Sequence, residues 1–275
     1  MPEGFPRIVV LDFEATCNLG DPPDPQEVIE FPSVLVDLES GAVVDAFESF
    51  VRPVHHPKLS DFCTELTSIT QADVDGADPF EVVFARHQAW LRSHDLVDPE
   101  TFAILTCGNW DFRTLFPRQC EAAGVLLADV PRCYRRWIDL KVPFAKTMKA
   151  KKAGGMVKML AALDLELQGR HHRGIDDCRN IARVVLELAS RGATFEITAE
   201  IPRSRYPDLP LVLRHGDIEK HVVLRKRAYP SLEGLVSGAY RRQCVALHHD
   251  GAPLDDDTVV DLRPGDVLDV TLRAD

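Results

Sequence analysis

Short apolar runs alternate with longer amphipathic stretches along the first 200 residues, a pattern that is typical of an α/β domain. A short apolar run bounded by turn residues predicts a strand. The turn Ser40-Gly41 joins two such runs and predicts a hairpin. Five strands are expected in all, at residues 8–13, 28–38, 42–51, 101–107 and 137–140.

Helical periodicity predicts three helices in the same region. Pro79 starts the first helix. Its expected apolar stripe consists of Val82, Val83, Ala85, Ala89, Trp90 and Leu91. A second helix is expected after Asn109. The strongest helical pattern covers residues 174–190 and ends at a glycine stop signal. We therefore expect an α/β domain in residues 1–200.

The last quarter of the chain is organised differently. The segment PRSRYPDLP holds three prolines in nine residues, which predicts a linker at 201–209 between the first domain and a second domain at 210–275. The order strand, strand, helix, strand, strand predicts a compact α+β module near the lower size limit for independent folding. Its expected landmarks are the turn Gly216-Asp217, a short helix from Ser231, and turns at Asp250-Gly251 and Pro264-Gly265.

Composition narrows the class of protein. A chain of 275 residues with 45% hydrophobic and 27% charged residues has enough apolar surface for a packed core, which argues against disorder. We expect no membrane span, because no apolar run approaches roughly 18 residues, and the start MPEGFPR shows no secretory signal. Seven cysteines without a CxxC pair are expected to be reduced thiols, which favours the cytoplasm.

The distribution of charge is uneven. A net charge of −11 argues against a protein that coats nucleic acid through overall positive charge. Residues 132–158 contrast with the rest, because they carry nine basic side chains and one acid. Such a run forms either a solvated helix face or a track for phosphates, and charge alone does not separate the two.

Two carboxylates follow the first predicted strand. Side chains alternate along a strand, so Asp12 and Glu14 are expected on the same face. Two like charges so close repel, and a cation between them stabilises the pair. Mg²⁺ suits such a site because it prefers oxygen ligands. A DxE pair alone arises by chance in most proteins, so it gains weight only in combination with other residues.

The segment HHRGIDD allows two pairings, His171 with Asp176 or His172 with Asp177. Asp177 shares a helical stripe with three apolar residues, so we expect it to face the domain interior. Asp176 aligns with Asn180 on a stripe that we expect to be solvated, where the helix dipole favours an acid. Helical periodicity therefore favours the pair His172 and Asp177.

Asp111 follows the predicted strand 101–107, after a glycine that frees the backbone to turn. As a lone residue, Asp111 is expected to cap the next helix, and Asn109 competes for that role. It becomes a site candidate only together with the carboxylates above.

Taken jointly, Asp12, Glu14, Asp111, His172 and Asp177 resemble the motifs of the DEDDh superfamily of 3′–5′ exonucleases, in order and spacing. The resemblance is closest to the Eri1-type, KapD-like branch and covers almost all of residues 6–200. It rests on the segments DFEAT, EVIEFPSVLVD, LSDFCTELTSITQADVD, CGNWD and HHRGIDDCRNIARV.

This resemblance implies an RNase H-like fold with a mixed five-stranded sheet flanked by helices. It also implies two Mg²⁺ or Mn²⁺ ions that bind the scissile phosphate. By position, Asp12 would bridge both ions, Glu14 and Asp177 would hold the ion that carries the nucleophilic water, and Asp111 would assist the other. His172 would be the general base, a task that suits histidine because its ordinary pKa of about 6.5 lies near working pH.

The same resemblance implies contacts to the terminal nucleotide. Base stacking on apolar and aromatic side chains tolerates any base, although each matching residue is equally compatible with an ordinary core role. The matching residues are Phe13, Thr16, Phe62, Leu66 and Trp110, and the basic residues Lys149, Lys151 and Lys152 are expected to form a lid or track on the strength of their charge.

The C-terminal module resembles a ubiquitin-like β-grasp domain, with Leu254, Val260 and Leu262 at its buried positions. It lacks a terminal Gly-Gly, so conjugation is not implied, and a protein partner or the nucleic-acid strand are both open as its ligand.

The expected function is 3′–5′ exonucleolytic hydrolysis of single-stranded nucleic acid to nucleoside 5′-monophosphates, with RNA favoured. The alternatives are a DNA or short-oligonucleotide exonuclease, and a non-catalytic regulator on a nuclease fold.

Overall fold

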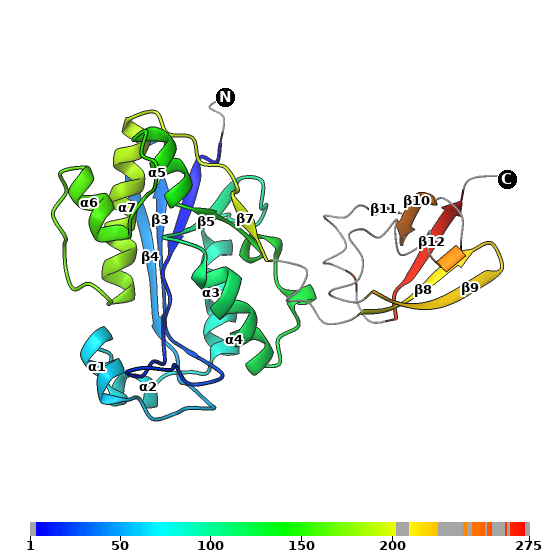
Figure 1. The fold of residues 1–275 in the computed structure, drawn as a ribbon, viewed down its shortest axis with the longest axis horizontal. Coiled ribbons are helices and arrows are strands. Elements are labelled where there is room, and N and C mark those ends of the chain that lie inside the picture. Colours follow the sequence, from blue (N-terminus) through cyan, green and yellow to red (C-terminus); the bar gives the residue numbers. More distant parts are fainter. Residues whose placement is uncertain are drawn as a thin grey trace. The chain divides into compact units, whose positions relative to one another are not determined.

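A computed structural model describes residues 4–201, 209–224, 239–240, 244–250, 252–254, 262 and 265–272. The chain forms two compact units, residues 1–125 with 131–201 and residues 126–130 with 202–275. Each unit has its own sheet and its own hydrophobic core (Figure 1). The linker expected at 201–209 and the helix expected from Ser231 lie largely outside the described residues, so the domain boundary stays a prediction.

A mixed sheet forms the centre of the first unit and contains the five strands that the sequence predicts. β1 and β2 follow each other along one side of β3, with Leu11 opposite Ser33 and Glu14 opposite Glu30, all antiparallel. β5 runs parallel to both β1 and β6. The strands are β1 (Arg7–Leu11), β2 (Glu14–Ala15), β3 (Val28–Asp37), β4 (Ala42–Phe50), β5 (Phe102–Thr106), β6 (Arg136–Asp139) and β7 (Ala199–Glu200). β2 and β7 were not predicted, because two residues carry no periodic signal.

Helices cover both faces of this sheet. In Figure 1, α5, α6 and α7 lie on one face, α3 and α4 lie on the other, and α1 and α2 lie at one end. The predicted mixed sheet flanked by helices is therefore confirmed. The helices are α1 (Asp61–Thr67), α2 (Gln71–Asp75), α3 (Phe80–Ser93), α4 (Phe116–Ala122), α5 (Lys141–Thr147), α6 (Met156–Ala162) and α7 (Gly174–Ser190), with a π-helical turn η1 (Asp111–Leu115) and a 3₁₀ turn η3 (Arg132–Tyr134). The 3₁₀ turn η2 (Leu127–Asp129) is grouped with the second unit.

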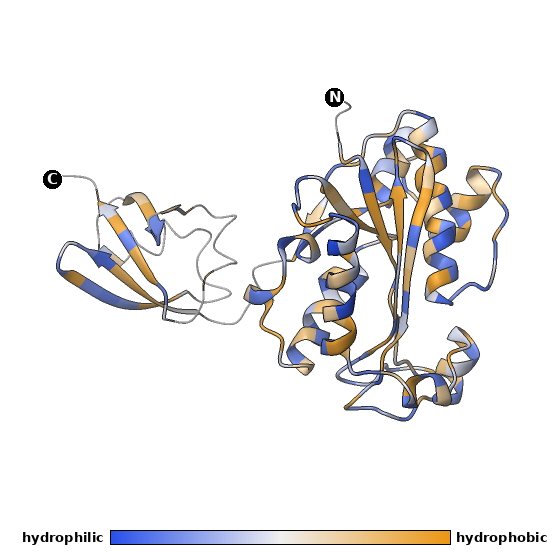
Figure 2. Cartoon of the chain, turned by 180° about the vertical axis from the view of Figure 1, so that it is seen from behind, coloured by the Kyte–Doolittle hydropathy of each residue, from blue (hydrophilic) through white to orange (hydrophobic). Residues whose placement is uncertain are grey.

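Alternation along the strands divides the core between the two faces. Ile8 and Val10 of β1 pack in one cluster with residues of α7. Phe13 and Phe31 join aromatic rings from α3 and α4 on the other face, with the Phe13 and Phe31 centroids 4.7 Å apart. Figure 2 shows mostly hydrophobic central strands and helices with mixed faces. The sheet is thus covered on both sides, which suits its near-continuous apolar strands.

The helix predictions were correct in position and partly wrong in detail. The helix expected over 174–190 is confirmed without a shift. The stripe expected on α3 is wrong at Val82, Ala85 and Ala89, which are exposed. The buried face of α3 instead contains Phe80, Val83, Phe84, His87 and Leu91. The short helices α1, α2, α5 and α6 span five to seven residues each, too few for a periodic signal.

The second unit contains a five-stranded sheet with the order β11-β10-β12-β8-β9. β8 and β9 form the hairpin expected at Gly216-Asp217, and β12 runs parallel to β8. Leu262 is buried as expected, Leu254 is only partly buried, and Val260 lies outside the described residues. The strands are β8 (Leu209–His215), β9 (Ile218–Leu224), β10 (Cys244–His249), β11 (Ala252–Pro253) and β12 (Val267–Leu272).

Among the described residues, no helix combines the length and the apolarity that a bilayer span requires.

A buried histidine crosses the core of the first unit. The ring nitrogens of His87 lie 2.6 Å from the Tyr134 hydroxyl and 2.8 Å from the Ser33 hydroxyl, and its ring stacks on Phe31. Burial lowers the pKa of His87 to about 3. In the folded protein His87 therefore stays neutral, whereas in the unfolded chain it is protonated below the ordinary histidine pKa of about 6.5. His87 stabilises the fold fully only above that pH.

We expect this linkage to weaken the fold in acid as pH falls from about 6.5 toward 3. Between pH 7 and pH 5, His87 should cost the wild type about 2 kcal/mol of unfolding free energy. His87→Gln retains hydrogen-bonding groups but does not titrate. Urea unfolding of both proteins at both pH values measures the difference, and parallel pH profiles would contradict the assignment.

Candidate active site and metal centre

Carboxylates from two distant segments meet next to β1. Asp12 follows the last residue of β1, and Glu14 begins β2. One carboxylate oxygen from each of Asp12, Glu14 and Asp177 lies within 4.8 Å of the other two. The separation of these oxygens suits ligation of a common divalent cation, for which carboxylates are the preferred protein ligands. The structure therefore brings together three of the predicted ligands.

Asp111 is held against the same segment. β1 and β5 are neighbouring parallel strands, so Asp12 and Asp111 both follow the carboxyl ends of strands at one edge of the sheet. Asp111 begins the π-helical turn, and its Oδ1 accepts a hydrogen bond from the Phe13 backbone N–H at 3.1 Å. The cap role open to Asn109 is not observed, because its side chain binds residues of β6.

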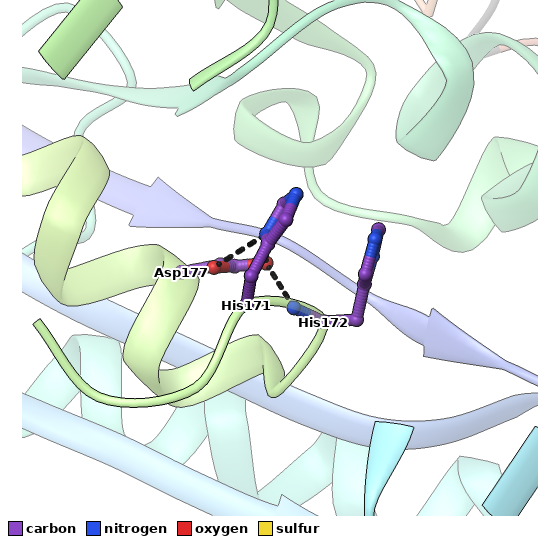
Figure 3. A group of neighbouring side chains, drawn as sticks. All are labelled: His171, His172 and Asp177. Atoms are coloured by element: carbon purple, nitrogen blue, oxygen red, sulfur yellow. Dashed lines mark hydrogen bonds and ion pairs between the residues drawn. The ribbon is translucent and has the colours of Figure 1, made fainter. Parts of the chain in front are cut away.

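Asp177 lies in the first turn of α7 and is 3% exposed. Its carboxylate accepts the backbone N–H of His172 at 2.9 Å and contacts Nδ1 of His171 at 3.0 Å (Figure 3). The two imidazole rings stack with centroids 3.9 Å apart. His172 thus reaches Asp177 through its backbone, while the His171 side chain makes the contact that sequence reasoning did not foresee.

Asp176 and Asp177 point in the directions that helical periodicity predicts. Asp177 faces the interior with the apolar stripe, whereas Asp176 accepts the N–H of Arg170 and pairs with Arg179. The solvated stripe expected around Asp176 is wrong at Asn180, which is fully buried. Its amide binds backbone groups of Gln168, so a polar partner made that burial possible.

The electrostatics of the cluster reflect burial and crowding. Burial, followed by the charge of Asp111, raises the pKa of Asp12 well above its ordinary value. Burial also raises the pKa of Glu14 to about 9 and that of Asp111 to about 6. The pKa of Asp177 is raised by burial too. A buried group of carboxylates that repel each other, with oxygen donors only, fits a hard divalent cation such as Mg²⁺ or Mn²⁺.

The predicted contacts to substrate divide into two groups. Phe62 and Leu66 are partly exposed one turn apart on α1, and the Trp110 side chain is 42% exposed beside Asp111. The ring of Phe13 is instead buried among core aromatics, and the Thr16 hydroxyl accepts the N–H of Glu27. The side chains of Phe13 and Thr16 therefore have structural partners, and a base cannot stack on the buried ring. Lys149, Lys151 and Lys152 are exposed between α5 and α6.

Sequence reasoning missed Glu30, which lies opposite Glu14 in the β2–β3 pairing and is fully buried. The available signal was a single acid among the apolar residues that surround it in VIEFPSVLVD. A charge on a buried strand requires a partner, and Glu30 finds one in the backbone of α7.

Comparison with known proteins places this geometry in a family. Residues 9–185 match the family model Exonuclease (RNase_T). ERI1 exoribonuclease 3 of Homo sapiens is 40% identical over 202 residues, which is 72% of this chain and 58% of that protein. The 3'-5' exoribonuclease 1 of Homo sapiens is 34% identical over 199 residues, 72% of this chain and 56% of that protein. The chain thus spans a little over half the length of these curated relatives.

Solved structures show the same fold. The nuclease domain of 3'hExo, a DEDDh family member bound to rAMP, superposes with a TM-score of 0.67 at 33% identity, covering 72% of this chain and 98% of that domain. A 3'-exonuclease in 3'-end specific recognition of a histone mRNA stem-loop gives a TM-score of 0.66 at 29% identity, covering 80% and 91%. The expected RNase H-like fold is confirmed. The chain belongs to the RNase_T exonuclease family, and its solved neighbours include a DEDDh enzyme.

Proposed function

We propose that this chain is a metal-dependent 3′–5′ exonuclease that removes nucleoside 5′-monophosphates from single-stranded nucleic acid, with RNA preferred. The observation that carries the proposal is the convergence of Asp12, Glu14 and Asp177 within 4.8 Å, with Asp111 hydrogen-bonded beside them. The preference for RNA rests on the relatives, which are named exoribonucleases.

The carboxylates are proposed to hold two Mg²⁺ or Mn²⁺ ions. Asp12 would bridge both ions, Glu14 and Asp177 would share one, and Asp111 would serve the other. Bound ions would supply Lewis acidity at the scissile phosphate and a nucleophilic water. The protein contributes buried oxygen ligands at fixed positions, because backbone N–H groups hold Asp111 and Asp177.

His172 is proposed to be the general base. Burial, followed by the neighbouring His171, lowers the pKa of His172, which favours the neutral imidazole that can accept a proton from the attacking water. The ring of His171 is committed to Asp177. We therefore assign different roles to the two histidines: His171 positions the metal ligand Asp177, and His172 accepts the proton of the attacking water.

The nucleotide is proposed to lie between α1 and the start of η1. Phe62, Leu66 and Trp110 offer partly exposed apolar surface for base stacking, worth about 1–3 kcal/mol per base. The exposed lysines 149, 151 and 152 would neutralise phosphates of the incoming strand.

The second unit is proposed to be a ubiquitin-like β-grasp module that binds a partner protein. Support comes from its strand order, in which β8 and β12, the first and last strands among its described residues, lie side by side and parallel. Six cysteines of the first unit are outside disulfides, which supports a cytoplasmic location; they are Cys17, Cys63, Cys107, Cys120, Cys133 and Cys178.

Degradation of 5′-labelled RNA and DNA of equal sequence tests the function. We expect a descending ladder from the 3′ end of RNA that needs Mg²⁺ or Mn²⁺ and stops with EDTA. Faster loss of DNA would overturn the RNA assignment. Inactivity on every 3′ end with either ion would favour a regulatory protein on a nuclease fold.

Asp12→Asn should leave the fold intact and abolish cleavage, because it removes the charge proposed to bridge two ions while keeping the volume. The variant should also show a smaller rise in Tm on addition of Mn²⁺ than the wild type, since at a given ligand concentration weaker binding stabilises the fold less. Differential scanning fluorimetry with Mn²⁺ and with EDTA measures Tm, and the assay on 5′-labelled RNA measures cleavage. An active Asp12→Asn protein would rule out this metal site.

His172→Ala should retain metal binding and lose about 10²- to 10⁴-fold in kcat, the usual contribution of a general base. His171→Ala should lose less than about tenfold, because the His172 backbone N–H still holds Asp177. Single-turnover cleavage of labelled RNA compares the two. The opposite ranking would show that the pairing of histidine and aspartate was assigned wrongly.

Replacing Lys149, Lys151 and Lys152 together by alanine should flatten the dependence of log KM on log salt by about 2, since each phosphate contact on a single strand contributes about 0.7. Arg86 and Arg92 on α3, exposed on the opposite face of the sheet, provide a control pair. An unchanged slope in the lysine variant would assign the basic run to a solvated surface.

A further inference from the structure

A fully buried carboxylate on β3 holds the start of α7. Glu30 is 0% exposed, and its two oxygens accept the backbone N–H groups of Gly174 at 3.0 Å and of Ile175 at 3.3 Å. These are among the first N–H groups of α7, which have no acceptor within the helix. Glu30 therefore fixes the N-terminal turn that carries Asp177 to the central sheet.

The first residue of α7 packs directly against the backbone of a proposed ligand. A Cβ atom at Gly174 would lie 2.8 Å from the carbonyl oxygen of Asp12 and 2.9 Å from Cγ of Pro32. Such distances require a backbone shift, so this position tolerates only glycine at the observed separation. The helix and the segment after β1 are thus in close contact beside the proposed metal site.

Arg173 extends the connection to a second strand. Its Nε lies 3.2 Å from Glu30, its Nη2 donates to Glu48 of β4 at 2.8 Å, and its guanidinium lies 4.6 Å from the centre of the Phe50 ring. The Arg173 side chain is 20% exposed and that of Glu30 is 0% exposed, so water and salt screen this ion pair less than they screen an exposed pair. The residue that precedes α7 is therefore anchored to both β3 and β4.

Glu30 also lies opposite Glu14 in the antiparallel pairing of β2 and β3. Directly opposed residues lie on the same face of a sheet, about 5 Å apart at Cβ. Glu30 thus lies on the strand that pairs with β2, which carries Glu14, and its side chain binds the helix turn that carries Asp177. We propose that Glu30, with Arg173, is a positioning residue that keeps Asp177 within ligand distance of Asp12 and Glu14. This inference rests on the proposed metal site.

Two physical effects of Glu30 must be separated. A buried negative charge next to Glu14 attracts a cation whatever the geometry. The contacts of Glu30 and Arg173 described above act differently, because they fix the position of α7. Removing Arg173 distinguishes them, because loss of a positive charge near the site strengthens cation binding by charge alone. Loss of the contacts that Arg173 makes to β3 and β4 weakens cation binding if those contacts position α7. The sign of the change in Arg173→Gln therefore decides between charge and position.

The experiment is isothermal titration of the full chain with Mn²⁺. Glu30→Gln should raise the Mn²⁺ dissociation constant about tenfold, in the range seen when residues that orient metal ligands are replaced. Arg173→Gln should raise it as well. At saturating Mn²⁺, kcat of Glu30→Gln should return to within about threefold of the wild type, since the ligands themselves are intact.

Glu27→Gln is the matched control. Glu27 is also buried, 2% exposed, and accepts the backbone N–H groups of Val54, His55 and His56, remote from α7. Its loss should lower Tm without changing the Mn²⁺ dissociation constant.

The outcomes are distinct. A wild type that binds no Mn²⁺ would refute the proposed metal site itself. A wild type that binds Mn²⁺ with unchanged affinity in Glu30→Gln, or an equal loss in Glu27→Gln, would overturn the positioning role. Tighter Mn²⁺ binding by Arg173→Gln would show that Glu30 and Arg173 act on the site through their charge and not by positioning α7.

Discussion

Repulsion among buried carboxylates is the constraint on which the first unit depends. Asp12, Glu14, Asp111 and Asp177 come from three segments of the chain, and burial raises the pKa of each. Folding brings these groups together although they oppose one another, so other interactions must offset the cost. Backbone N–H groups bind Asp111 and Asp177, and a bound divalent cation would offset the remaining repulsion between the carboxylates.

The surrounding structure makes this arrangement possible by being rigid. β1 and β5 are central parallel strands, so the segments after them leave the sheet at one edge. Aromatic rings in mutual contact pack next to that edge on the face covered by α3 and α4, where Phe13 contacts both Phe31 and Phe116. The buried His87 pairs with side chains on β3 and η3, which adds directional bonds to an otherwise apolar core. The site therefore rests on packed elements rather than on loops alone.

The helix that carries Asp177 is oriented by polar contacts as well as by packing. Its apolar stripe buries Ile181, Val184 and Leu188 against the sheet, which fixes its axis and rotation. Its position along the sheet is fixed at the first turn, where Gly174 allows close approach and Glu30 binds the N–H groups. Hydrophobic packing tolerates small sliding motions, whereas these hydrogen bonds do not.

The sequence by itself determined the five main strands, α7 with its boundaries, the inward face of Asp177 and the residues that form the carboxylate cluster. The strands, α7 and the inward face of Asp177 follow from local periodicity, whereas the members of the carboxylate cluster follow from the joint resemblance of several motifs to one family. Only the tertiary structure decided that Phe13 and Thr16 are buried, that His171 contacts Asp177 and that Glu30 binds α7. These features depend on contacts between residues up to 145 positions apart, and the direction of a side chain at such a contact is set by packing that no local pattern encodes.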